Sequence, residues 1–385
     1  MVDEPLKTVY IIGSGFSVGV GGPLLYDLLS DRGRAEMLAR FPALEPCEYV
    51  YNVFWRHQRG NKKADGHEIL WSHAEEFLDY VNTTAWTTGA RTSVLENILR
   101  DVSVASFKSI ADFARLAAFA VAAECSFARD QNPLRESWEP YVDWSRGLQK
   151  QDVVVTFNYD TVLENIGGFP SRRLAVNLGK KSIVHPFETN TYEGTPVYKL
   201  HGSTQWSLGG TKDHPSYGFD LDLETVFKRD WEPLIGMPGP SKRDHCFRHF
   251  ESLWEDAMIR LRGADVVVFM GYRFPPSDSY ARTKLLGALK ANKNHYLRIH
   301  TVLGPDLNHE NSVRLIKLLE LTLKSAGRDT VDRPTWRSDN STAPSFDVIP
   351  QPLYAEDYMS VIGDDELYGL DVNGPIRRGL RTSKP

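Results

Sequence analysis

A chain of 385 residues is long enough for two domains, or for one large domain that carries an insertion. Hydrophobic residues make up 41% of it and charged residues 25%, as in an ordinary soluble globular protein. The net charge of −5 gives no indication of nucleic acid as the main partner, so we expect no direct nucleic-acid binding.

The cysteines are an odd, sparse set without a CxxC pair: Cys47, Cys125 and Cys246. They exclude a disulfide framework and a four-thiolate zinc site, and they fit a reducing cytoplasm. The first residues, MVDEPLKTVY, do not resemble a signal peptide, and the most apolar helical stretch, 113–129, is too short to span a bilayer. We therefore expect a cytoplasmic protein without a membrane partner.

Residues 8–12 (TVYII) predict a short buried strand that ends at a glycine-rich loop, GSGFSVGVGG. Pro23 is well placed as the first residue of a helix through LLYDLLSDRGRAEMLARF. A strand, a glycine-rich loop and a helix in this order can cradle a nucleotide phosphate, because the backbone approaches closely and the helix N-terminus favours negative charge. The alternative is a tight turn without a ligand.

The loop departs from the common dinucleotide fingerprint G-x-G-x-x-G. Gly13 and Gly15 match it, but Val18 stands at the third glycine position and Gly19 comes one residue later. No second strand that ends in an acidic residue is evident about 20 residues further on. The pattern therefore argues against an ordinary hydride-transfer Rossmann domain.

Residues 46–149 have helical spacing and almost no β-branched runs, which predicts a helical insertion. The periodic segments are ILWSHAEEFLDYV (69–81), SVLENILRDV (93–102) and SIADFARLAAFAVAAE (109–124). Glu75 and Glu76 are assigned to a solvated helix face, with closure over a pocket as the alternative.

Short apolar strands then return at 153–157, 197–200, 265–270 and 297–303, and the segment 345–353 adds a last strand. Such strands separated by helices, among them an amphipathic helix at 311–327, predict a parallel sheet covered on both faces. We therefore expect an α/β fold, a Rossmann-like parallel sheet flanked by helices. The expected domains are 1–45 with 150–360 for the sheet, 46–149 for the helical insertion and 361–385 for a polar tail.

Unusual residues follow the predicted strands in the segments GSGFS, TFNYD, KLHGS and GYRFPPSD. Because a parallel sheet brings such strand ends to one edge, where ligands bind, their convergence is the main functional indication. Taken singly, each has a structural explanation. Asn158 or Asp160 would cap a helix, His201 would be a satisfied core residue, and Gly271 would allow a close backbone approach.

Other candidates are less specific. Tyr272 and Arg273 are suited to contact a base or a phosphate. His245 and His249 lie four residues apart with Cys246 between them, but no third ligand is apparent, so we expect no metal site. Cys246 lacks the partner arrangement of a nucleophile.

In their order along the chain, these motifs resemble the sirtuin superfamily. The resemblance is carried by Gly13-Ser14-Gly15-Phe16-Ser17, Thr156-Phe157-Asn158-Tyr159-Asp160, His201-Gly202 and Gly271-Tyr272. Deacetylase sirtuins carry a four-cysteine zinc module after the His-Gly motif, whereas residues 203–265 contain only Cys246, and Phe157 replaces the usual glutamine. With the helical block, these departures make the chain similar to the sirtuin-like NAD+ hydrolases of bacterial antiphage defence systems.

The resemblance implies that NAD+ is the substrate and that no metal takes part. The pyrophosphate would lie over the loop Gly13–Ser17, with Gly271 and Tyr272 also in the binding site. Asn158 would orient the nicotinamide ribose and the attacking water, and Asp160 would hold ribose hydroxyls or the loop. His201 would act as general base in releasing nicotinamide and ADP-ribose. Hydrolysis and cyclisation of NAD+ are not distinguished.

The resemblance also implies a homo-oligomer and a separate partner protein, such as a short Argonaute or a DNA-translocase-like ATPase. Two alternatives to the hydrolase stay open. One is a sirtuin-type protein deacylase, which needs an acyl-lysine channel beside the nicotinamide pocket. The other is a non-catalytic sensor or assembly module that binds NAD or ADP-ribose.

Overall fold

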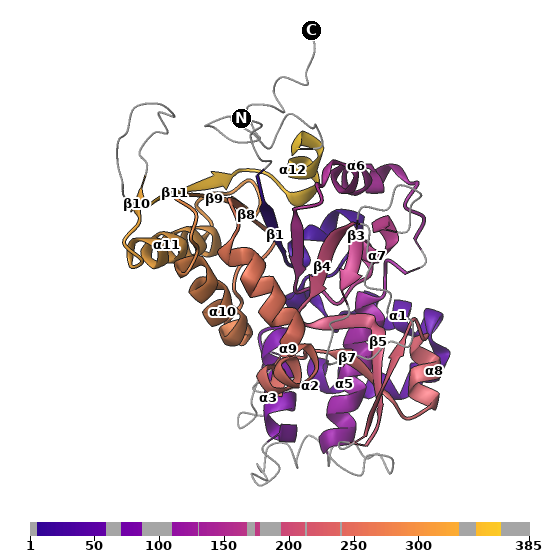
Figure 1. Cartoon of the computed structure of the whole chain (residues 1–385). Coiled ribbons are helices and arrows are strands. Elements are labelled where there is room, and N and C mark those ends of the chain that lie inside the picture. The colour runs from indigo at the N-terminus through magenta and orange to yellow at the C-terminus, as the bar shows by residue number, and fades with distance from the viewer. Residues whose placement is uncertain are drawn as a thin grey trace.

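A single sheet of eight parallel strands runs through the computed structural model, which describes residues 6–58, 71–86, 110–129, 131–167, 174–177, 194–211, 214–238, 241–330 and 344–362 (Figure 1). Its strands are β1 (Thr8–Ile12), β2 (Val153–Thr156), β3 (Leu174–Asn177), β4 (Thr195–Lys199), β8 (Val266–Met270), β9 (Tyr296–Val302), β10 (Asp329–Thr330) and β11 (Ser345–Gln351). All neighbouring strands pair in parallel. The predicted α/β fold with a Rossmann-like sheet is confirmed.

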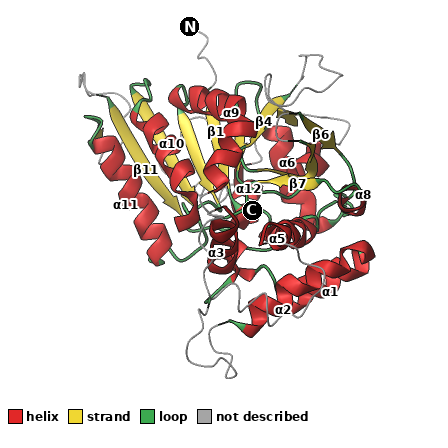
Figure 2. Cartoon of the chain, turned by 90° about the horizontal axis from the view of Figure 1, so that it is seen from below, coloured by secondary structure: helices red, strands yellow, loops and turns green. Residues whose placement is uncertain are grey.

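Helices cover both faces of this sheet. One face packs against α9 (Ser241–Arg262), α10 (Ser279–Lys290) and α11 (Glu310–Lys324), and Figure 2 shows α10 and α11 along the strands. The other face packs against α6 (Glu139–Gly147), α7 (Val162–Gly167) and α12 (Ala355–Ile362). Strand β1 contributes Val9 and Ile11 to the first core and Tyr10 and Ile12 to the second. Because its side chains alternate between two apolar layers, the strand is apolar at every position from Val9 onward.

The strand order, β10-β11-β9-β8-β1-β2-β4-β3, reverses direction at β1. The strands that follow β1 in the chain, β2 to β4, all lie on one side of it. The later strands β8 to β11 lie on its other side. In doubly wound sheets, the loops on either side of such a point separate and leave a crevice at the carboxyl ends of the strands. A ligand site is therefore expected beyond the ends of β1 and β8.

A second, helical layer lies below the carboxyl edge of the sheet in Figure 1. It contains α1 (Asp31–Arg40), α2 (Glu48–Arg56), α3 (Ala74–Trp86), α5 (Ile110–Cys125) and α8 (Leu223–Lys228), which share one hydrophobic core. Helix α6, although it lies between 46 and 149, packs instead against α12 and the large sheet. The N-terminal helix α1 joins the helical layer.

A small antiparallel sheet, which was not predicted from the sequence, adjoins this layer. Its strands are β5 (Gly202–Gly210), β6 (Pro215–Phe219) and β7 (Glu232–Ile235), in the order β6-β5-β7. Strand β5 begins directly after His201. That histidine therefore lies at the junction of the two sheets.

The helix predicted to begin at Pro23 is an α-helix only in its second half, so its predicted start is wrong. The chain forms a short 3-10 helix at Leu25–Asp27, and α1 begins only at Asp31, where the Ser30 hydroxyl accepts a hydrogen bond from Gly33 N. Leu28 and Leu29 are buried in the helical layer, and Leu29 adopts a left-handed φ of 60°. The leucines have helical spacing, but tertiary burial sets the conformation of this segment.

The predicted helix at 69–81 is shifted: α3 begins at Ala74 and extends to Trp86. The Glu76 side chain accepts a hydrogen bond from Ser72 N, and the His73 side chain accepts one from Glu76 N. Both side chains therefore cap the N-terminus of α3, and the helix begins at Ala74. The predicted helical segment 93–102 and the polar tail from 363 onward lie outside the described residues. No helix in the described ranges is both long and apolar enough to cross a membrane.

Glu124 provides a test of how the helical layer is stabilised. Its Oε1 accepts hydrogen bonds from Tyr51 Oη (2.8 Å) and Leu29 N (2.9 Å). Burial nevertheless raises the pKa of Glu124 from 4.5 to about 7. Between these values the folded chain keeps a proton that the unfolded chain has lost, so this group makes folding less favourable as pH rises through the window.

We expect Glu124→Gln to remove that pH dependence, because an uncharged amide keeps the acceptor oxygen for both donors. Urea denaturation at about pH 5 and about pH 8 should show a gain in stability for the variant, relative to wild type, that is larger at the higher pH. Equal differences at the two pH values would contradict the assignment.

Candidate functional site

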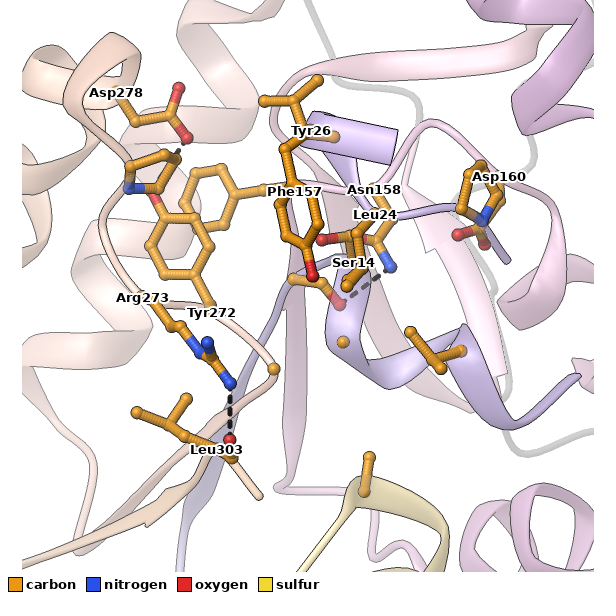
Figure 3. Close-up of a pocket in the computed structure, with 18 of the residues that line it drawn as sticks. Ser14, Leu24, Tyr26, Phe157, Asn158, Asp160, Tyr272, Arg273, Asp278 and Leu303 are labelled. Carbon is orange, nitrogen blue, oxygen red and sulfur yellow. Dashed lines mark hydrogen bonds between the residues drawn. The ribbon is translucent and has the colours of Figure 1, made fainter. Parts of the chain in front are cut away.

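A cavity of about 460 Å³ lies at the carboxyl edge of the large sheet, within the usual size range of small-molecule sites. The loops that follow β1, β2, β4, β8 and β9 form one side of it, and residues of the helical layer form the other. Figure 3 shows Tyr272 and Asp278 on one side of the cavity and Asp160 on the other, with Phe157 and Asn158 between them. The predicted convergence of the strand ends therefore occurs around one cavity.

The glycine loop lines the cavity through Gly13, Ser14 and Gly15. Its backbone packs against the loop after β8. Gly13 N donates to Met270 O at 3.0 Å, and Gly15 N donates to Gly271 O at 3.3 Å. A Cβ at Gly15 would lie 2.8 Å from the Gly271 Cα, and Gly271 itself has a φ of +67°. These glycines are thus required by contact between two backbones, independently of any ligand.

Phe16 and Ser17, predicted to bind the nucleotide, are buried beneath the loop and do not line the cavity. The loop continues into 3-10 helices of three residues each, Ser14–Phe16 and Val18–Val20, and not into an α-helix. The prediction of an α-helix directly after the loop is therefore wrong, so no α-helix N-terminus faces the predicted phosphate position. Phe16 packs edge-on against Tyr141 of α6, with ring centroids 5.1 Å apart.

Asn158 follows β2 and faces the glycine loop (Figure 3). Its Nδ2 donates to Gly13 O and to Ser17 Oγ, each at 3.1 Å. Because a backbone carbonyl can only accept a hydrogen bond, the contact with Gly13 fixes which end of the amide is the NH2 group. Among the described residues, no hydrogen bond reaches Asn158 Oδ1, so this oxygen can accept one from a ligand.

Asp160 joins the same network. Its Oδ2 accepts a hydrogen bond from Ser17 Oγ at 2.7 Å, and its Oδ1 accepts one from Val162 N at 3.1 Å, at the start of α7. Burial raises the pKa of Asp160, although nearby Lys199 and both hydrogen bonds act to lower it. Asp160 therefore ties the start of α7 to the glycine loop, while it also lines the cavity.

Lys199, at the end of β4, is a supporting residue that was not predicted from the sequence. Its side chain is 1% exposed, and Nζ donates to the Asp160 carbonyl oxygen and to Glu164 Oε1, the latter at 2.8 Å. This ion pair engages the carboxylate of Glu164 in α7. Lys199 thereby links the end of β4 to the loop that carries Asn158.

His201 lies two residues beyond Lys199 and lines the cavity with a side chain that is 4% exposed. The next residue, Gly202, has a φ of +84°, and a Cβ there would clash with Leu234 O in β7. The imidazole lies edge-on to Phe157, with ring centroids 4.8 Å apart. Phe157 in turn stacks on Tyr272 at 4.2 Å, so aromatic rings form this wall of the cavity.

Asp278, the last residue of the segment GYRFPPSD, and Lys242 complete this wall, and no role was predicted for either side chain from the sequence. Asp278 Oδ1 is 3.9 Å from His201 Nε2 and accepts a hydrogen bond from Lys242 Nζ. Asp278 Oδ2 accepts one from Tyr272 Oη at 3.1 Å. Burial acts to raise the pKa of Asp278, but the charges of Lys242 and His201, together with the hydrogen bonds from Lys242 and Tyr272, lower the pKa overall. Asp278 is therefore a carboxylate at neutral pH.

Other parts of the chain close the cavity. Arg273 and Arg314 line it, and they donate to the Leu303 and Arg273 carbonyl oxygens at 2.6 and 3.2 Å. Leu24 and Tyr26 contribute from the segment before α1, and Glu75 contributes from α3, so the alternative of closure over the pocket holds for Glu75.

Metal ligation finds no support among the described residues, whose Asp, Glu, His and Cys side chains form no group that could hold a metal ion. His249 Nδ1 contacts Tyr217 Oη at 3.1 Å. The side chains of His245 and Cys246 lie outside the described residues.

The backbone contact at Gly271 provides a test of what holds the cavity open. We expect Gly271→Ala to destabilise the fold by about 1–3 kcal/mol or more, because it combines a left-handed φ with a clash against Gly15. Gly287→Ala is the matched control, since nothing lies within 4 Å of its added Cβ in α10, and it should stabilise by about 0.5–1 kcal/mol. Urea denaturation of both variants measures the difference, and effects of the same sign would contradict the role given to this contact.

Comparison with known proteins gives no further assignment. No family model matches the chain, and no curated protein matches it. Its function is therefore inferred from the cavity and its residues.

Proposed function

We propose that the chain is an NAD+ hydrolase that cleaves the bond between nicotinamide and ribose and releases ADP-ribose. The observation that carries this proposal is that Asn158, His201 and the loop 13–15 line the same cavity, at the point where the strand order reverses. These residues are far apart in sequence, and each is predicted at the site from the sequence alone.

Asn158 has the geometry to orient a ribose hydroxyl or a water molecule. Its NH2 group is held by Gly13 and Ser17, which leaves Oδ1 to accept a hydrogen bond from the substrate. A side chain held by two protein hydrogen bonds does not have to be ordered when the substrate binds, so the entropy cost of positioning falls.

His201 is suited to take a proton from that hydroxyl or water. The carboxylate of Asp278 lies 3.9 Å from Nε2, where it stabilises the imidazolium that forms when the proton is accepted. The glycosidic bond breaks through an oxocarbenium-like state and nicotinamide leaves with the bonding electron pair. The water oxygen bonds to the anomeric carbon of the ribose as His201 takes its proton, which gives ADP-ribose. Arg273 and Arg314 supply positive charge on the cavity wall for the pyrophosphate.

A non-catalytic module that binds NAD or ADP-ribose is the second candidate. It is favoured by the structural roles of Asn158 and Asp160, whose hydrogen bonds to Ser17 hold the glycine loop in place. A binding module would need these contacts but no proton acceptor. Nicotinamide release distinguishes the two functions, and turnover of an acetylated peptide would indicate a deacylase.

On the sequence resemblance alone, we also propose that the activity serves antiviral defence by depleting NAD+. The chain would act as a homo-oligomer with a separate partner protein, such as a short Argonaute or a DNA-translocase-like ATPase. Assays should therefore cover a wide range of protein concentrations, because activity that rises with assembly would be missed in dilute solution.

The direct test is incubation of the purified chain with NAD+ and separation of nicotinamide, ADP-ribose and cyclic ADP-ribose. We expect nicotinamide release by wild type and a loss of about 10²–10⁴-fold in His201→Ala, the range that a positioned general base contributes. Asn158→Ala should lose activity as well. His214→Ala, at an exposed position in the β5–β6 turn, is the matched control and should retain the wild-type rate.

Melting temperatures of all variants, measured without ligand, separate lost chemistry from lost folding. A ligand-induced rise in melting temperature without nicotinamide release would support the binding module. Turnover by His201→Ala at the wild-type rate would disprove the role of that residue.

A further inference from the structure

Three charged or titratable side chains lie in a row at the His201 end of the cavity. Lys242 Nζ donates to Asp278 Oδ1, and the same oxygen lies 3.9 Å from His201 Nε2. The side chains of Asp278 and His201 are each 4% exposed, and that of Lys242 is 8% exposed. Water therefore screens these charges little, and each strongly influences its neighbour.

We propose that Asp278 is a positioning residue that orients His201 and favours its protonated form, and that Lys242 limits this effect by pairing with the same carboxylate oxygen. The catalytic part of this inference rests on the proposed NAD+ hydrolysis. The electrostatic coupling among the three side chains is a property of the protein itself and can be measured without substrate.

The carboxylate of Asp278 is held from two directions. Lys242 reaches it from α9, and Tyr272 donates to its other oxygen from the loop after β8. Asp278 is the last residue of the short 3-10 helix Pro276–Asp278, directly before α10. A carboxylate fixed on both oxygens cannot rotate away when His201 accepts a proton, so its charge stays near the imidazole.

The pKa of Asp278 supports this arrangement. Burial acts to raise it, but the neighbouring charges of Lys242 and His201 and the hydrogen bonds from Lys242 and Tyr272 together lower it, so the carboxylate stays ionised at neutral pH. The ammonium of Lys242 acts on His201 in the opposite sense, because a nearby cation disfavours a second positive charge. The two substitutions should therefore affect His201 in opposite directions.

Other charged groups surround the row and remain unchanged in the variants below. Asp79 of α3, whose pKa is raised by burial and by Glu75, also feels the charge of Lys242. Tyr272 feels both Asp278 and Arg282 of α10, and Asp160 lies across the cavity. Since this background is constant, a change in His201 reports on the substituted residue.

The first test follows the imidazole resonances of His201 by NMR during a pH titration of protein labelled at its 11 histidines. The spectrum of His201→Gln identifies the resonance by its loss. We expect Asp278→Asn to move the His201 titration midpoint to lower pH and Lys242→Met to move it to higher pH. Unchanged midpoints, or shifts in the same direction, would overturn the proposal.

Two matched controls lie in exposed ion pairs away from the cavity. Asp143→Asn removes a carboxylate that pairs with Arg146 at 2.9 Å, and Lys228→Met removes an ammonium that pairs with Glu224 at 3.2 Å. Neither should move the His201 midpoint. A shift in these controls as large as that in the cavity variants would show a general charge effect and overturn the coupling.

The second test measures nicotinamide release. Asp278→Asn should lower kcat about tenfold or more, as a share of the ~10²–10⁴-fold that a positioned base contributes, with a smaller change in KM. The acidic limb of the pH–rate profile should move to lower pH in Asp278→Asn and to higher pH in Lys242→Met.

In a His201→Gln background, Asp278→Asn should cause no further loss, whereas additive losses would show that Asp278 does not act through His201.

A variant with an unpaired buried Lys242 is prone to misfold, so the double variant Asp278→Asn, Lys242→Met removes both charges together. We expect it to melt close to wild type and yet to share the loss of kcat. A wild-type rate in this folded double variant would overturn the proposal. If wild type releases no nicotinamide at all, the proposed function fails while the NMR titration still decides the coupling.

Discussion

The close approach of two backbones, at Gly15 and Gly271, joins the ends of β1 and β8, and the shape of the cavity depends on it. Hydrogen bonds from Gly13 N to Met270 O and from Gly15 N to Gly271 O link the two loops. A Cβ at any of these glycines would lie within 3 Å of the opposite backbone. The glycine-rich loop therefore has a structural cause of its own, and a ligand site is indicated by the residues that converge beside it.

The buried hydroxyl of Ser17 connects the glycine loop to the residues that follow β2 through two hydrogen bonds. Ser17 Oγ donates to Asp160 and accepts from Asn158, so a single side chain orders both. The side chains proposed to act on a ligand are thus also part of the fold. This dual use makes the site rigid before any ligand binds, which favours both catalysis and selective binding.

Buried ion pairs hold the remaining walls. Lys199 pairs with Glu164 behind Asp160, and Lys242 pairs with Asp278 beside His201. Burying such charges costs desolvation energy that their attraction only partly offsets, so these pairs are poor candidates for simple stabilisation. Each lysine instead joins two separate segments: Lys199 joins the end of β4 to α7, and Lys242 joins the start of α9 to the 3-10 helix before α10.

The strands β1, β2, β4, β8, β9 and β11, and the sheet edge at which the site lies, follow from the residues alone, whereas β3, β10 and the small antiparallel sheet do not. The apolar runs of β1, β2 and β8 have no continuous polar face, so a sheet covered on both sides buries them, and parallel strands place their polar ends together. The helical spacing of the leucines at 23–30 gave a wrong prediction. These leucines line the wall of the cavity or pack in the core of the helical layer, and that tertiary packing sets the backbone conformation. The meeting of Lys242 and Asp278 with His201 depends on the packing of α9 and α10 against the sheet. No local propensity carries that information, because the contact joins segments that are distant in the chain.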